Sequence, residues 1–95
     1  MERFKQLFEE VKGNQMKAEL LFRFLSPDSS IELYEEYVRL EEEQYELYSE
    51  MVGEIMESGL AELFYDNLMV ILPHMDGLEF SIRESKRLIK EMKAA

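Results

Sequence analysis

The sequence predicts an all-α protein: an antiparallel, up-down-up three-helix bundle with a long third helix that is kinked at a proline. Two observations predict this fold. Apolar residues recur at alternating steps of three and four along three long segments, which is the pattern of amphipathic helices packed in a left-handed, coiled-coil-like way. The 95 residues include only four Gly and two Pro, too few for the many turns of an all-β fold. The length fits a single domain, residues 1–95.

The first helix is expected over about residues 2–25. Its apolar positions follow one another at steps of three or four, with Asn14 as the one polar member. Gly13 beside it weakens the helix by roughly 1 kcal/mol relative to Ala. Ser26 and Pro27 mark the end of this helix, because proline is poorly tolerated inside a helix and serine caps the next one.

The second helix is expected over about residues 28–57. Ser29 and Glu32 have the spacing of a capping box at its start. Its core-facing positions are apolar or aromatic with one exception, Glu41. Gly59 then predicts a short reversal, because glycine commonly ends a helix.

The third helix is expected over about residues 59–93. Pro73 lies inside this segment, but the apolar period keeps one phase on both sides of it. A true break would shift that phase, so we expect one helix, roughly 50 Å long, that bends at Pro73.

Antiparallel packing with short turns brings three polar positions to one level of the bundle: Asn14, Glu41 and His74. A lone buried carboxylate costs several kcal/mol unless it is paired, and His74 is the expected hydrogen-bond donor to Glu41. Two interpretations remain open. The favoured one is a polar layer that fixes helix register, and the other is a metal site, because Glu and His are both metal ligands.

The net charge of −10 is concentrated in the middle of the chain, where residues 28–66 hold thirteen acidic groups and one basic group. Such a surface repels phosphate backbones, so we expect no binding to nucleic acid. It attracts cations or a basic protein partner. The simplest interpretation of the acidic residues is a solvated helix face.

No segment predicts membrane insertion or export. The longest apolar run, residues 68–72, is far too short to cross a bilayer, and the N-terminus has no continuous apolar stretch. We therefore expect a cytoplasmic protein. The chain contains no Cys and one His, and it has no phosphate-binding glycine loop or nucleophile elbow, so the sequence favours a non-catalytic role.

The second helix carries a further row of apolar side chains, beside its main row. A heptad-spaced row of this kind predicts an interface, most simply that of a two-fold homodimer, with a partner helix from another protein as the rival. The candidate interface residues are Leu33, Tyr37, Leu40, Leu47 and Met51, together with Phe80 of the third helix.

A metal site is the second functional hypothesis. Glu62 and Asp66 are four residues apart, a spacing that puts two carboxylates on one helix face. Together with Glu41 and His74 they are the candidate ligands for a divalent metal or iron.

Part of the chain resembles a known family. Residues 65–69, 75–78 and 85–89 resemble the long third helix of the repeat in PhoU-like phosphate-uptake regulators. That repeat is a three-helix bundle of about this length, and Glu62 and Asp66 match the family's acidic metal motif. Because such proteins carry two repeats, the resemblance implies that a single-repeat chain dimerises and acts as a regulatory or accessory interaction module.

A second resemblance implies a different function. Residues 42–45 are similar to the Glu-x-x-His helix of ferritin-like carboxylate proteins, with Tyr45 where His belongs. The function that this resemblance implies is a carboxylate-rich metal-binding bundle, with oxidoreductase activity as the corresponding chemistry.

Overall fold

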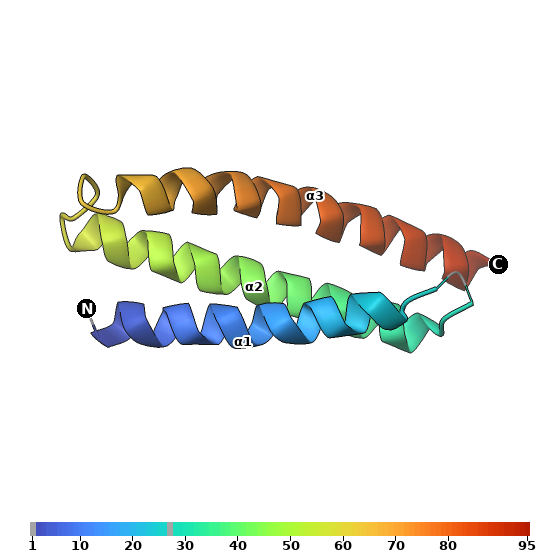
Figure 1. Cartoon of the computed structure of the whole chain (residues 1–95). Coiled ribbons are helices and arrows are strands. Elements are labelled where there is room, and N and C mark those ends of the chain that lie inside the picture. The colour runs from blue at the N-terminus through green and yellow to red at the C-terminus, as the bar shows by residue number, and fades with distance from the viewer. Residues whose placement is uncertain (1, 27) are drawn as a thin grey trace.

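A computed structural model describes residues 2–26 and 28–95 as three helices with no strand among them. The helices are α1 (Glu2–Phe24), α2 (Ile31–Glu57) and α3 (Tyr65–Ala94), and chain neighbours run antiparallel (Figure 1). The predicted all-α three-helix bundle is confirmed. Pro27, which the sequence places at the end of the first helix, lies outside the described residues.

The central helix of the bundle is α2. Both α1 and α3 pack against it, but among their described residues no Cα atom of α1 lies within 8 Å of one of α3. Figure 1 shows α2 between the other two helices, and the molecule measures 50 × 20 × 16 Å. The bundle is therefore open along one side rather than closed as a triangle.

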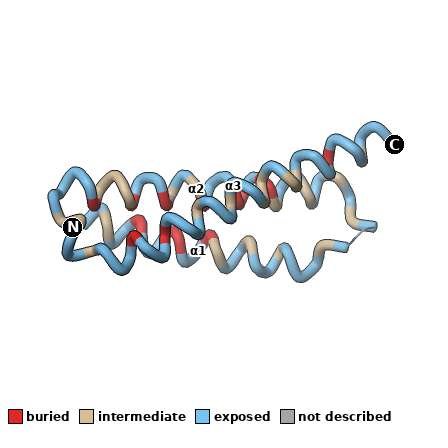
Figure 2. Tube along the Cα trace, turned by 90° about the horizontal axis from the view of Figure 1, so that it is seen from above, coloured by how far each residue is buried: buried red, intermediate tan, exposed pale blue. Residues whose placement is uncertain are grey.

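Most of the buried segments lie in the part of the rod from the end that holds the N-terminus to its middle (Figure 2), and this part includes the hydrophobic core cluster. Its buried cluster contains residues of all three helices, and the rings of Phe4 and Phe64 lie 5.0 Å apart beside it. Fully burying a side chain of this size stabilises the fold by about 1.5–3 kcal/mol. The buried members are Leu7, Val11, Tyr48, Met51 and Ile71.

The helix α2 begins three residues later than predicted. Its N-cap is Ser30, whose hydroxyl accepts a hydrogen bond from the backbone N–H of Leu33 at 3.4 Å. The predicted capping box is wrong, because the Ser29 hydroxyl instead accepts from the backbone N–H of Ser26 at 2.9 Å. Ser29 therefore stabilises the turn before the helix.

The helix α3 begins at Tyr65, six residues later than predicted, because residues 58–64 form a longer connection. Gly59 has φ of 73°, in the left-handed region, and ends α2. The N–H groups of Gly59 and Leu60 bond the carbonyls of Met56 and Ile55, which is the pattern of a Schellman motif.

Pro73 lies inside α3 without interrupting it, so the prediction of one helix through this residue is confirmed. Its side chain is exposed, and so is Met69, whose carbonyl loses its helical partner when residue 73 has no N–H. Both residues thus lie on the solvent-facing side of the helix. Figure 1 shows α3 as one gently curved helix.

None of the helices in the described ranges is long and apolar enough to cross a membrane.

Candidate functional site

The candidate site is a groove between α1 and α3 whose floor is α2. It contains two depressions of about 350 Å³ and 430 Å³. Gln15 of α1 borders both of them. The lining of the first includes Phe22, Tyr37, Glu41, Gln44, His74 and Leu78, and that of the second includes Phe8, Val11, Tyr48, Met51, Val70 and Ile71.

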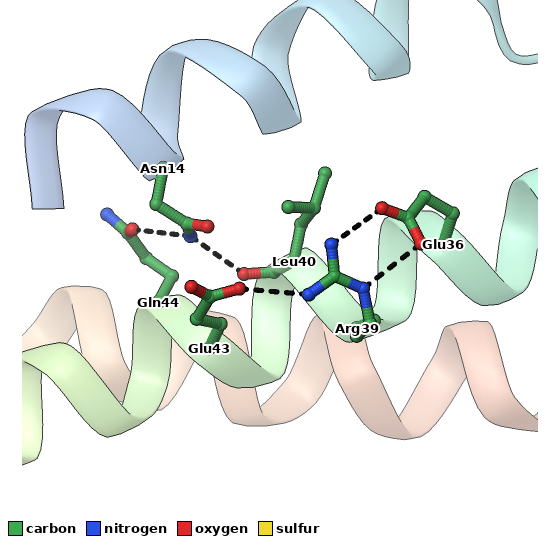
Figure 3. Close-up of polar contacts among 6 residues, drawn as sticks. All are labelled: Asn14, Glu36, Arg39, Leu40, Glu43 and Gln44. Atoms are coloured by element: carbon green, nitrogen blue, oxygen red, sulfur yellow. Dashed lines mark hydrogen bonds and ion pairs between the residues drawn. The ribbon is translucent and has the colours of Figure 1, made fainter. Parts of the chain in front are cut away.

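Asn14 is buried at the junction of α1 and α2. Its side-chain nitrogen donates to the carbonyl of Leu40 and to Oε1 of Gln44, both at 2.9 Å (Figure 3). The sequence placed Asn14 correctly at the level of Glu41. Asn14 bonds the neighbouring positions on α2 and not the carboxylate of Glu41.

These contacts fix the orientation of the Gln44 side chain. The Leu40 carbonyl only accepts, so the atom of Asn14 beside it must be the amide nitrogen. That nitrogen also requires an acceptor on Gln44, which leaves Nε2 of Gln44 free. This nitrogen is buried without a hydrogen-bond partner, and the residue is 3% exposed.

Glu41 is the second buried polar residue of the floor, at 4% exposure. Its Oε2 accepts a hydrogen bond of 2.5 Å from the hydroxyl of Ser81 on α3, while Oε1 has no partner. Burial raises the pKa of Glu41, and the Ser81 hydrogen bond opposes that effect. Burial also raises the pKa of Tyr37, with the charge of Glu41 as a further cause.

His74 does not belong to a buried layer, so that prediction is wrong. Its side chain is exposed and its ring lies 5.3 Å from the ring of Tyr48, at the edge of the groove. The cause is the longer connection between α2 and α3, which moves every pairing of these helices by about seven residues. Glu41 therefore meets Ser81, two helical turns beyond His74 on the same face.

The predicted leucine interface on α2 is also wrong in its main members. Leu40 and Met51 are buried inside the chain, and Tyr37 and Leu47 are half-buried. The reason is that α2 is covered from two sides, so its second apolar row packs against a flanking helix rather than against a second molecule. Of the predicted interface residues, Leu33 and Phe80 stay exposed.

The residues proposed as metal ligands are not brought together. Within residues 2–26 and 28–95, no group of three or more His, Cys, Asp or Glu side chains is placed to hold a metal ion. Glu62, in the connection before α3, and Asp66, in its first turn, are both exposed. Glu41 and His74 do not contact each other through a hydrogen bond or ion pair. The structure thus offers no built metal site among these residues.

The acidic surface of α2 is partly matched by basic residues of the flanking helices. Arg3 of α1 pairs with Glu50 at 2.5 Å, and Lys86 of α3 pairs with Glu42 at 3.0 Å. Arg39 bridges two carboxylates of its own helix, as Figure 3 shows. All of these pairs are exposed, so each contributes little to stability, and they mark a solvated face.

Sequence reasoning missed Gln44, the residue that links Asn14 to the groove. Its position, three residues after Glu41 and therefore on the same helix face, is the signal that points to it. Among the residues that the structure describes, the groove offers apolar walls together with one unpaired acceptor, on Glu41, and one unpaired donor, on Gln44. Comparison with protein families, curated proteins and solved structures finds no match for this chain.

Proposed function

We propose that this chain is a non-catalytic, self-associating helical module, of the regulatory or accessory kind, and similar in shape to a PhoU-like repeat. The groove between α1 and α3 receives a helix from a second copy of the chain. The observation that carries this proposal is the separation of α1 from α3, which leaves an apolar groove along the open side of the bundle.

The walls of the groove carry large apolar side chains that the single chain leaves in water. Phe8 and Phe22 of α1 and Val70 of α3 are exposed, with Phe22 at 62%. Several large apolar side chains exposed along one groove mark an interface. A fourth helix laid in the groove buries these side chains and completes a four-helix arrangement.

A second copy fits because the groove face of α1 is self-complementary. Its residues run Phe8, Lys12, Gln15, Glu19 and Phe22, and all five line the groove. When two copies of α1 pair antiparallel about a two-fold axis at Gln15, each Phe8 faces a Phe22. Lys12 then faces the position next to Glu19 of the second copy, so opposite charges meet.

Sedimentation equilibrium of untagged protein tests this function. We expect the mass of two chains for the unaltered protein and at least about 700-fold weaker association for Phe22→Glu, because a charge in a buried contact costs at least about 2 kcal/mol at each of two symmetric sites. Leu63→Glu is the matched control, since Leu63 is 74% exposed and lies in the turn before α3, outside the groove.

Circular dichroism must show that both variants fold, because Phe22 also packs on Tyr37 with ring centroids 5.7 Å apart. The proposal fails if the unaltered protein has the mass of one chain at every concentration, or if the Leu63 and Phe22 variants weaken association equally.

A further inference from the structure

We propose that the unpaired polar atoms of Glu41 and Gln44 form a binding site for a carboxamide, and that Gln15 of a second copy supplies it. The inference rests on the self-association proposed above and adds the chemistry that sets its register.

The site consists of Glu41 and Gln44, which line the same depression and each carry one unpaired polar atom. Oε1 of Glu41 and Nε2 of Gln44 are both buried without a partner, and both residues are more than nine-tenths buried. Their second polar atoms are already held, by Ser81 and Asn14 respectively. Unpaired buried groups are costly, so a ligand that satisfies both is favoured over one that satisfies neither.

Only some ligand chemistries satisfy this pair. An ammonium or guanidinium group donates to Glu41 and leaves Gln44 unpaired. A carboxylate accepts from Gln44 and is repelled by Glu41. A carboxamide does both, because its NH₂ group donates to the carboxylate and its oxygen accepts from the amide of Gln44.

Gln15 is the residue of the second copy that reaches this level. It follows Asn14, which bonds Gln44, and it lies where the antiparallel pairing of the two α1 helices places the two-fold axis. In the single chain its carboxamide donates only at 3.4 Å, to the exposed Glu19 of the same helix. Because this hydrogen bond is long and exposed, breaking it costs little free energy. A polar side chain on such an axis fixes the register of paired helices, as a buried Asn does in coiled coils.

The test introduces a charge clash with one substitution and removes it with a second. The dissociation constant of the dimer is measured by sedimentation equilibrium for each variant. Gln15→Glu brings a carboxylate against Glu41, and we expect association to weaken at least about tenfold. Adding Glu41→Gln to that variant supplies a second NH₂ donor, while its oxygen still accepts from Ser81. The double variant is therefore expected within about threefold of the unaltered protein.

Two controls show whether the repair is local. Glu19→Gln removes a negative charge from the rim of the same depression, and it is expected not to restore Gln15→Glu. Gln6→Met is expected to leave association unchanged, whereas Gln15→Met, the same chemical change within the groove, is expected to weaken it at least about tenfold.

The outcomes separate the two proposals. If Phe22→Glu dissociates the dimer while Gln15→Met and Gln15→Glu associate like the unaltered protein, the carboxamide site is wrong and the self-association stands. Equal repair by Glu19→Gln and Glu41→Gln also overturns the carboxamide site, because it shows an effect of net charge alone. If the unaltered protein is a single chain, both proposals are wrong.

Discussion

At the scale of single residues, the burial of Asn14 and Glu41 was predictable, whereas the exposure of His74 and the partners of both buried residues were not. The apolar periodicity places Asn14 and Glu41 at core-facing positions, and both are buried. Their partners, Gln44 and Ser81, depend on how far one helix is displaced along another. That displacement is set by the length of the connections, and the periodicity of a single helix carries no information about it.

The carboxyl group of Glu41 predicts a pH-dependent stability. Because burial raises its pKa in the folded chain, the folded state keeps a proton that the unfolded state releases above the ordinary value of 4.5. The free energy of unfolding therefore falls as pH rises from 4.5 through the raised pKa. Glu41→Gln removes this dependence, so its stability relative to the unaltered protein is expected to increase with pH in urea titrations.

Glu36 provides the opposite sign as a control. Its hydrogen bond to Arg39 lowers its pKa, so its contribution to stability is present above 4.5 and is lost as pH falls through the lowered value. Glu36→Gln is therefore expected to have a lower free energy of unfolding than the unaltered protein above pH 4.5, and this difference is expected to shrink as the pH falls. A flat difference between the unaltered protein and Glu41→Gln across this window contradicts the account of the buried carboxylate.

At the scale of the elements, the number of helices and the continuity of α3 through Pro73 were predictable, but the start of α3 was not. Residues 60–64 contain Leu, Ala and Glu, which favour helices, and the apolar phase continues through them. The Schellman motif at Gly59 prevails over that propensity by turning the chain away from the axis of α2. The resulting connection of seven residues moved His74 out of the layer in which the sequence placed it.

Gly59 predicts a stability change with a matched control. An Ala at φ of 73° is strained, so Gly59→Ala is expected to lower the free energy of unfolding by about 1–2 kcal/mol. Gly13 lies inside α1 with open space around its Cβ position, so Gly13→Ala is expected to raise it by about 1 kcal/mol. Urea titration of both variants checks this, and the same sign of change in both contradicts the role of Gly59.

At the scale of the whole molecule, the sequence shows that the chain has more apolar side chains than its own core buries, but it does not show on which helices the surplus lies. Two apolar rows on α2 were interpreted as one core face and one dimer face, whereas two flanking helices bury most of both, including Leu40 and Met51. The surplus instead lies on α1 and α3, at Phe8, Phe22 and Val70. The positions of α1 and α3 around α2 decide which apolar side chains stay exposed. The apolar pattern of a single helix does not encode those positions.

The central claim is that α1 of a second copy occupies the groove in antiparallel orientation about Gln15. The chain contains no Cys, so single spin labels can be attached at Met16→Cys, Leu20→Cys and Phe24→Cys, three exposed positions along α1. We expect the distance between the two labels in a dimer, measured by double electron–electron resonance, to increase from residue 16 to 20 to 24, because its axial component grows by about 12 Å at each step of four residues. Equal separations at all three positions, or no intermolecular distance at any of them, would contradict the account.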